Sequence, residues 1–257
     1  SAMCPLCHRA PHTEQHIIWE CPETLKNENE HIQDTNHMAG VAIRGIATYP
    51  CLWIRCLLPA QLTRTPATPE GRQAALGTMR WMIRGSILVF YTDGSGGGQS
   101  DPRLRRCGWS AIVLNGTTME YAVFGAVPGP AGEQTVPKAE LLAGIRALQS
   151  APVDVRVHIF SDNLGFVKGH ARGPTGLKKT ANPDLWTVWW ELCGKMDFLP
   201  IVEKVKGHCT AKHILDGTIT ADQLLGNSLA DALAGVGAGM GQLAQHYIDE
   251  VNLLDLQ

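Results

Sequence analysis

The stretch Ile87-Leu88-Val89-Phe90-Tyr91-Thr92-Asp93-Gly94-Ser95-Gly96 decides the fold of this chain. Its five leading apolar residues predict a buried strand, and the Asp-Gly-Ser-Gly segment that follows predicts a turn. Open α/β sheets gather their ligands at the carboxyl ends of the strands. Asp93 therefore stands where a sheet of this kind places functional side chains.

The residues after this stretch predict a mixed sheet. Asn115-Gly116 lies between two apolar runs and is the strongest short signal for a β-hairpin. Further strands and helices follow from periodicity. The predicted strands are 87–91, 108–114, 118–124, 155–160 and 199–205, and the predicted helices are 138–148, 164–171, 185–195 and 223–235. A meander followed by crossover connections predicts an α/β fold with a mixed five-stranded sheet flanked by helices.

The residues before this domain differ in character. Residues 36–85 predict helices, interrupted by Thr65-Pro66-Ala67-Thr68-Pro69, which has the composition of a linker. A helical pattern resumes over residues 71–84. The apolar run 38–62 predicts helices in a core rather than a membrane span, because two arginines would lie within the lipid. We therefore predict four parts: a metal-binding segment (1–30), a helical linker region (31–85), an α/β domain (86–235) and a C-terminal extension (236–257).

The composition limits the functions open to the chain. Its 257 residues are 44% hydrophobic and 18% charged, enough to bury a core, and the net charge is −2. The chain as a whole is not basic, so any surface that binds nucleic acid must be a local patch of positive charge. Among the eight cysteines are two close pairs, Cys4/Cys7 and Cys51/Cys56. This favours a metal site in a reduced, intracellular protein over a disulfide scaffold.

Four carboxylates are candidates for a metal site. Asp93 and Asp162 each follow an apolar strand, Glu140 lies in the first turns of the first helix, and Asp231 lies in the last predicted helix. A single Asp after a strand is usually a turn residue or a helix cap. If the two strands are neighbours, however, the acids converge and repel one another unless a cation is bound. Oxygen ligands favour Mg²⁺ or Mn²⁺, and two ions about 4 Å apart can clamp a phosphodiester.

Five motifs resemble the ribonuclease H family, in the order of that family and over residues 86–235. They are Phe90-Tyr91-Thr92-Asp93-Gly94-Ser95, Lys138-Ala139-Glu140-Leu141-Leu142-Ala143, Ser161-Asp162-Asn163, Val205-Lys206-Gly207-His208 and Gly226-Asn227-Ser228-Leu229-Ala230-Asp231-Ala232-Leu233-Ala234. The resemblance implies a ribonuclease H-like fold and endonucleolytic hydrolysis of the RNA strand of RNA–DNA hybrids by a two-metal-ion mechanism. It implies that Asp93, Glu140, Asp162 and Asp231 bind two Mg²⁺ (or Mn²⁺). It also implies that His208, on a mobile loop, shuttles a proton or helps to release the product.

The resemblance extends to the substrate side. Gln134-Thr135 resembles a polar pair that touches the RNA strand, whose 2′-hydroxyls distinguish it from DNA. Basic residues from 168 to 179, followed by Asn182-Pro183-Asp184-Leu185-Trp186, resemble the protrusion that contacts the DNA strand. The implied substrate-binding residues are Gly94, Ser95, Gln134, Thr135, Asn163, Lys178, Lys179 and Trp186. By their clustering, Arg103, Arg105 and Arg106 form a second candidate group for phosphate, although a basic loop is usually only solvated surface. Trp186, Trp189 and Trp190 cannot all face one way, so at least one belongs to the core.

The amino-terminal motif predicts a zinc site. Cys4, Cys7, His16 and Cys21 have the spacing C-x₂-C-x₈-H-x₄-C, which suits tetrahedral Zn²⁺, although His8 and His12 are competing ligands and unrelated free thiols are the alternative. The motif resembles the zinc knuckle near the C-terminal end of non-LTR retrotransposon reverse transcriptases. That resemblance implies one structural Zn²⁺ and an upstream reverse transcriptase domain in the same polyprotein. It also implies an intracellular location, in a nuclear or cytoplasmic ribonucleoprotein of a mobile element.

Two other functions compete with the nuclease. The first is an inactive module that tethers a polymerase to hybrid, and the second is an integrase-like DNA recombinase on the same fold. All four acids are present, which favours an active enzyme, and the Gly207-His208 loop argues against the recombinase. The expected partner is an RNA–DNA hybrid, without a membrane.

Overall fold

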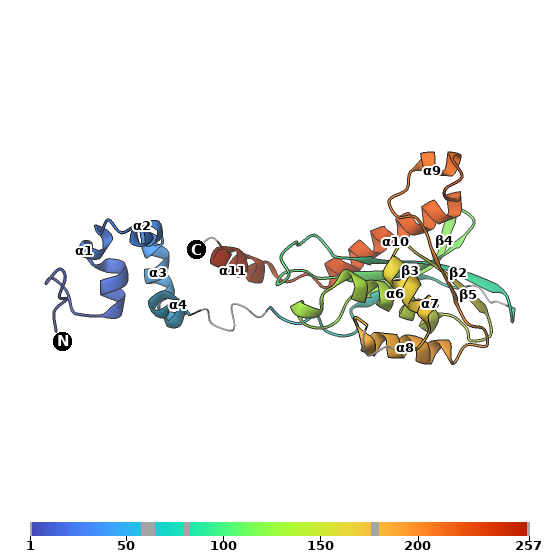
Figure 1. Ribbon diagram of the computed structural model, residues 1–257, viewed down its shortest axis with the longest axis horizontal. Helices are drawn as coiled ribbons and strands as arrows, with labels where there is room; N and C mark the ends of the chain where they lie inside the picture. Colours follow the sequence, from blue (N-terminus) through green and yellow to red (C-terminus); the bar gives the residue numbers. More distant parts are fainter. Residues whose placement is uncertain (1, 58–64, 80–82, 176–179, 256–257) are drawn as a thin grey trace. The chain divides into compact units, whose positions relative to one another are not determined.

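The computed structural model describes residues 2–57, 65–79, 83–175 and 180–255 (Figure 1). The chain divides into two compact units. The first comprises residues 1–65 together with 244–257, and the second comprises residues 66–243. Within the described ranges, no helix is long and apolar enough to cross a membrane.

Six strands form a single sheet in the second unit, in the order β1-β4-β3-β2-β5-β6. The pairs β1–β4, β4–β3 and β3–β2 are antiparallel, whereas β2–β5 and β5–β6 are parallel. The bounds are β1 (Gln73–Gly77), β2 (Ile87–Ser95), β3 (Gly108–Asn115), β4 (Thr118–Ala126), β5 (Arg156–Ser161) and β6 (Ile201–Lys204). The five predicted strands correspond to β2 through β6.

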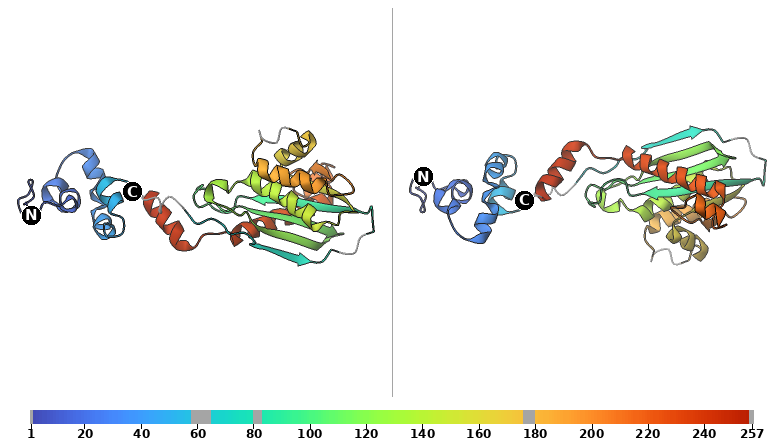
Figure 2. Two further views of the ribbon diagram at one scale, coloured as in Figure 1. Left: turned by 90° about the horizontal axis from the view of Figure 1, so that it is seen from below. Right: turned by 90° about the horizontal axis from the view of Figure 1, so that it is seen from above.

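Alternation along β2 explains why helices cover both faces of the sheet. Leu88 and Phe90 point into a core shared with α6 (Val136–Ser150) and α8 (Pro183–Cys193). Tyr91 points to the opposite face, into a cluster shared with α10 (Ala221–Met240). Successive side chains of a strand point to opposite faces, so a central strand is buried twice. Figure 2 shows α6 and α8 in front of the sheet from one side and α10 from the other.

The second unit also contains shorter elements: η2 (Ala131–Glu133), α7 (Leu164–Arg172) and α9 (Ala211–Leu215). The helices predicted at 138–148, 164–171, 185–195 and 223–235 correspond to α6, α7, α8 and α10. The predicted domain 86–235 lies inside this larger unit, which begins at Pro66 and ends at Leu243.

The helix predicted over residues 71–84 is wrong, because Gln73–Gly77 forms the sixth strand, β1. Ala75 pairs with Val123 of β4, and two glycines with positive φ mark the limits of the strand: Gly71 precedes it and Gly77 is its last residue. Ala and Leu favour a helix locally, but pairing with an open sheet edge outweighs that small preference. The sheet therefore has six strands rather than the predicted five.

The first unit joins the cysteine motif to a set of short helices. These are the π-helix η1 (His16–Glu20), α1 (Pro22–Leu25), α2 (Glu30–Asn36), α3 (Ala39–Gly45), α4 (Pro50–Arg55) and, from the C-terminal segment, α11 (Gln245–Asp255). Trp19 of η1 lies edge-on against the buried Trp53, with 6.1 Å between ring centroids, and donates a hydrogen bond to its carbonyl oxygen. The predicted boundary at residue 30 thus falls within one compact unit.

Close packing of α10 on the sheet depends on small residues. A Cβ atom on Gly108 of β3 would overlap the backbone of α10 at Ala234 and Ala238. The hydroxyl of Ser110 donates a hydrogen bond to the carbonyl oxygen of Ala230 at 2.7 Å, which ties the same helix to the same strand. The position of α10 on the sheet is therefore fixed by contacts at backbone distance.

Replacement of Gly108 by Val should lower the free energy of unfolding by about 1–3 kcal/mol, because α10 would have to move away from β3. The measurement is equilibrium unfolding in urea. Gly98→Ala is the matched control, since a Cβ atom there meets nothing within 4 Å, and its effect should stay within about 0.5 kcal/mol. Equal stabilities for the two variants would contradict this account of the packing.

Candidate active site

The register between β2 and β5 brings two carboxylates together. Thr92 pairs with Ser161, so the residues that follow, Asp93 and Asp162, lie side by side at the carboxyl edge of the sheet. The sequence predicted that the acids would converge if their two strands were neighbours, and β2 and β5 are neighbours in the sheet. Strand β2 continues to Ser95, so Asp93 lies within the strand rather than in the predicted turn.

Helix α6 crosses β2 at Gly94 and brings the third acid. A Cβ atom on Gly94 would lie 2.6 Å from the backbone nitrogen of Glu140, so only glycine allows this approach. The Glu140 side chain is buried and points at the two aspartates. One carboxylate oxygen from each of Asp93, Glu140 and Asp162 lies within 4.8 Å of the others.

The fourth acid, Asp231, comes from α10 on the opposite face of the sheet. It is exposed and lies close enough to Asp93 to raise the pKa of that carboxyl group. It stands outside the three-acid cluster. The four predicted acids therefore line one site, with three of them in close contact.

An open cavity of 390 Å³ contains the acids. It is lined by all four acids, by Gly94 and Asn163, and by residues that follow β6, among them Lys206, His208 and Cys209. His208 is exposed and has a φ of 51°, in the left-handed region that is uncommon for a residue other than glycine. The predicted catalytic residues thus face a single solvent-accessible space.

The electrostatics of the cluster favour protonation in the absence of cations. Burial raises the pKa of Asp93 to about 7, and the charges of Asp162 and Asp231 add to this effect. Burial likewise raises the pKa of Glu140 to about 9, with contributions from Asp93 and Asp162. Each carboxyl group is destabilised as an anion because water is excluded and like charges are close.

Ser161 and Asn163 hold Glu140 in place, and sequence reasoning did not assign them this role. The hydroxyl of Ser161, fully buried, lies 3.5 Å from Oε2 of Glu140 and accepts a hydrogen bond from the backbone nitrogen of Asn163. The Asn163 side chain is also hydrogen-bonded to Glu140, and its Oδ1 accepts from the nitrogen of Phe166 at the start of α7. Both residues flank Asp162 in the quoted motif, which was the available signal.

The structure corrects the expectation for Gln134. Its side chain is 2% exposed and makes three hydrogen bonds to backbone groups of Cys107, Val127 and Gly129. An amide engaged in this way joins two loops and is not free to bind RNA. Thr135 caps α6 and borders a separate cavity, so it remains available to a ligand.

The second basic group is also corrected. Arg103 forms an ion pair with Asp101, Arg105 donates to the carbonyl oxygen of Ser100, and Arg106 is 1% exposed and donates to the carbonyl oxygen of Pro66. These arginines hold the loop between β2 and β3 together. Lys178 and Lys179, the principal basic candidates, lie outside the described residues.

The three tryptophans of α8 do not all face one way, as the sequence predicted. Trp189 is fully buried, and Trp190 stacks on His170 with 5.3 Å between ring centroids. Trp186, the predicted substrate contact, is 7% exposed and packs against Phe166, with an edge that reaches a cavity of 260 Å³. Trp186 is therefore mainly a core residue rather than an exposed substrate contact.

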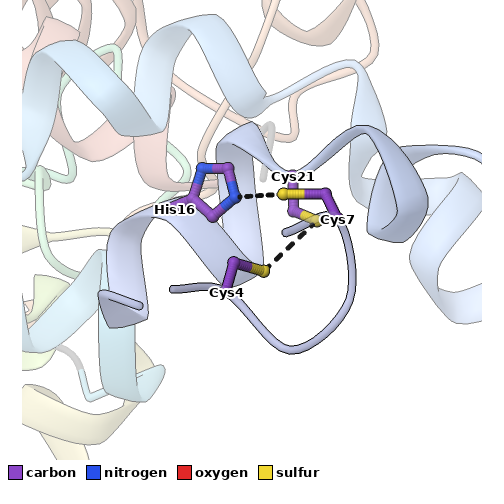
Figure 3. A group of neighbouring side chains, drawn as sticks. All are labelled: Cys4, Cys7, His16 and Cys21. Carbon is purple, nitrogen blue, oxygen red and sulfur yellow. Dashed lines mark hydrogen bonds between the residues drawn. The ribbon is translucent and has the colours of Figure 1, made fainter. Parts of the chain in front are cut away.

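The first unit brings the four predicted zinc ligands together (Figure 3). One ligand atom from each of Cys4, Cys7, His16 and Cys21 lies within 4.8 Å of the others, and this cluster includes neither His8 nor His12. The Sγ atoms of Cys4 and Cys21 are 3.8 Å apart, and Sγ of Cys7 lies 3.2 Å from Nε2 of His16. Burial opposes ionisation of Cys21, but the backbone N–H groups of Thr24 and Glu23 outweigh it and lower the pKa of this thiol to about 6.

Sequence reasoning missed the apolar side of the active site. Ile219 and Leu224 line the cavity opposite the first turn of α6, beside the buried Asn227. Both lie between the last two motifs: Ile219 precedes the predicted helix 223–235, and Leu224 falls at its start, where the periodicity gave no sign that it faces the acids. Only the return of the chain to the catalytic edge places them there.

A central sheet between two helical layers, with carboxylates at its parallel edge, defines a ribonuclease H-like α/β fold. Residues 85–238 match the model of the family described as RNase H. The chain therefore belongs to the RNase H family. No curated protein matches the chain at a significant level.

Solved structures with similar folds include three from different sources. LC9-RNase H1, a type 1 RNase H with the type 2 active-site motif, is 19% identical, with 66% of this chain and 82% of that chain covered and a TM-score of 0.44. The prototype foamy virus protease-reverse transcriptase is 23% identical, with 64% and 22% covered and a TM-score of 0.43. RNase H1 of the archaeon Halobacterium salinarum NRC-1 is 23% identical, with 60% and 98% covered and a TM-score of 0.38.

The raised pKa values make the metal-free protein less stable at high pH. Between the pKa of an unfolded carboxyl group, near 4, and the folded values of about 7 and about 9, the folded chain binds more protons than the unfolded chain. The free energy of unfolding therefore falls as the pH rises through this interval. In EDTA, the melting temperature should fall between about pH 5 and pH 9, and Mg²⁺ should remove most of this fall.

Glu140→Gln is the control for this prediction, because a neutral amide has no proton to lose. Its melting temperature in EDTA should depend less steeply on pH than that of the unaltered chain. Identical pH profiles for the two proteins, or a profile that Mg²⁺ leaves unchanged, would contradict the assignment of the buried acids.

Proposed function

We propose that the chain hydrolyses the RNA strand of RNA–DNA hybrids endonucleolytically, with two divalent cations, Mg²⁺ or Mn²⁺. The proposal rests on one geometric feature: Asp93, Glu140 and Asp162 place carboxylate oxygens within 4.8 Å of one another in an open cavity. Such a cluster suits a reaction at a phosphodiester, because hydrolysis requires positive charge beside both the attacking and the leaving oxygen. Membership of the RNase H family agrees with this chemistry.

The residues fit hard divalent cations. The donors are all carboxylate oxygens, and burial with mutual repulsion opposes their ionisation until positive charge is present. Asp93, Glu140, Asp162 and Asp231 would hold the ions. When bound, the ions supply an acidified water and charge that stabilises the attacked phosphate.

The chain's own residues supply orientation and proton transfer. Asn163 and Ser161 fix the Glu140 carboxylate before any ion binds, so the site is preorganised. His208, exposed at the cavity, can hold a proton and give it to the departing 3′-oxygen as the bond between phosphorus and that oxygen breaks. The products are a 5′-phosphate and a 3′-hydroxyl.

The cavity edges support selection of hybrid. Gly94 and Asn163 line the cavity, Ser95 follows Gly94 at the same strand end, and Thr135 caps the neighbouring helix. These groups would approach the RNA strand, where the 2′-hydroxyl is the distinguishing feature. Lys178 and Lys179 would bind the DNA strand.

We further propose one structural Zn²⁺ in the first unit. Zn–S bonds of about 2.3 Å in a tetrahedral site imply an S···S separation of about 3.8 Å, and the Cys4–Cys21 separation is 3.8 Å. The soft thiolates favour Zn²⁺ here, whereas the carboxylate cluster favours Mg²⁺. The lowered pKa of Cys21 adds a ligand that is already ionised near neutral pH.

The association of this cysteine motif with a nuclease supports an origin in a mobile element. We propose that the chain acts next to an upstream reverse transcriptase domain of the same polyprotein, in a nuclear or cytoplasmic ribonucleoprotein. The resemblance of residues 4–21 to the retrotransposon zinc knuckle carries this part of the proposal.

A cleavage assay with labelled RNA–DNA hybrid and Mg²⁺ tests the nuclease. Asp162→Asn removes one anionic oxygen with little change of shape, so cleavage should fall at least about 100-fold while hybrid binding remains. Asp154→Asn, at the opposite end of β5, is the matched control and should cut normally. Double-stranded DNA should not be cut.

Each rival function has its own outcome in this assay. Hybrid binding without cleavage by the unaltered chain would identify the inactive tethering module. Strand transfer on duplex DNA would identify the recombinase. Normal cleavage by Asp162→Asn would exclude the carboxylate site itself.

Zinc should be measurable by elemental analysis at about one ion per chain after dialysis. Cys7→Ser should lose this zinc and, because Trp19 of η1 packs on Trp53, should disorder the unit as far as α4. Tryptophan fluorescence should report this change, and hybrid cleavage should persist. Cys51→Ser, an exposed thiol outside the cluster, should retain the ion. A purified chain without zinc would refute the proposal.

A further inference from the structure

The chain between β6 and α10 forms a closed hairpin, which we call the finger (residues 206–220). The backbone nitrogen of Ile219 donates to the carbonyl oxygen of His213 at 3.1 Å, which joins its two legs. Thr210 and His213 cap the short helix α9 reciprocally. Leu215, at the end of α9, is 89% exposed, so the tip of the finger projects into solvent. Figure 1 shows α9 standing out from the body of the second unit.

The base of the finger is fixed to the catalytic site. A Cβ atom on Gly207 would overlap the carboxylate of Asp162, so the backbone passes directly against this acid. Lys206 and Ile219, from the two legs, both line the catalytic cavity, and Ile219 is 4% exposed. The finger therefore forms one wall of the cavity and continues beyond it.

The finger carries more positive than negative charge. Residues 206–220 contain two lysines, two histidines and one acid, Asp216. Hydrogen bonds from Thr218 lower the pKa of Asp216, and the nearby charges of His213 and Lys206 add to this effect. Three other cations of this unit are paired with acids: Lys138 with Glu133, Arg84 with Asp197 and Arg103 with Asp101. Lys206 and Lys212 are exposed, and within the described part of the chain neither ammonium group makes a hydrogen bond or an ion pair. Two exposed ammonium groups on the wall of a phosphodiester site suit a polyanion, and Asp216 offsets only part of their charge.

The finger also lies on the side of the sheet opposite the other basic residues. It leads into α10, which covers the Tyr91 face. Lys168 and Arg172 belong to α7, whose Phe166 packs in the core on the α6 face. Figure 1 shows α9 and α8 on opposite sides of the sheet. The catalytic edge is thus flanked by positive charge on both sides.

We propose that the finger binds the phosphate backbone of the nucleic acid through Lys206 and Lys212, on the flank of the cavity away from α7. This inference rests on the proposed function and adds a second contact surface to it. The finger would hold the hybrid against the acids, because its base is packed on Asp162. Its contacts are to phosphate, so they add affinity and register without reading base sequence.

The test is the salt dependence of hybrid binding by the full chain in an Asp162→Asn background with Mg²⁺, which keeps the hybrid uncut. Each phosphate contact contributes about 0.9 to the slope of log affinity against log salt. The double variant Lys206→Ala/Lys212→Ala should therefore bind more weakly and lower the slope by about 1.8. Lys212→Arg should restore the contribution of that position.

Lys195→Ala is the matched control, because this exposed lysine follows α8 near the amino ends of the strands, where the nitrogen of Asp197 donates to the carbonyl oxygen of Val153. Its slope should equal that of the background protein. An unchanged slope in the double variant, or an equal loss per charge in Lys195→Ala, overturns the finger contact. If the unaltered chain cuts hybrid, either result leaves the proposed function standing. If it neither cuts nor binds hybrid, the proposed function fails and the finger proposal with it.

Discussion

The approach of α6 to β2 at Gly94 is the contact on which the site depends. It sets the backbone of Glu140 against a strand and places its carboxylate beside that of Asp93. The β2–β5 register then supplies Asp162 at the same height. Three negative groups are thereby held together by rigid elements, at an electrostatic cost that the packing of the sheet and its helices must offset.

That cost explains several features around the site. Ser161 and Asn163 interact with Glu140, and the raised pKa values of Glu140 and Asp93 favour the protonated forms of these two groups until positive charge arrives. On the other face of the sheet, small residues let α10 lie close to the strands, so that Asp231 comes near Asp93 at the carboxyl edge. The site is therefore preorganised for cations by the same packing that makes it unfavourable without them.

The two units separate two kinds of metal chemistry. Thiolates and an imidazole gather in the first unit, where the core is small and a metal contributes directly to folding. Carboxylates gather in the second unit, which has a large core of its own. The Trp19–Trp53 contact extends the influence of the first site to helices well beyond the cysteine motif.

The sequence by itself determined the central strands, the main helices and the four acids that line the cavity, because these follow from local periodicity, from residues at strand ends and from short motifs. Tertiary structure alone decided that Gln73–Gly77 pairs with β4, that the side-chain amide of Gln134 is hydrogen-bonded to the backbone of two loops, and that Arg106 is buried. It also decided that the finger returns to the cavity beside Asp162. Each of these outcomes depends on partners distant in the chain, and burial or pairing at that range leaves no periodic trace in the sequence.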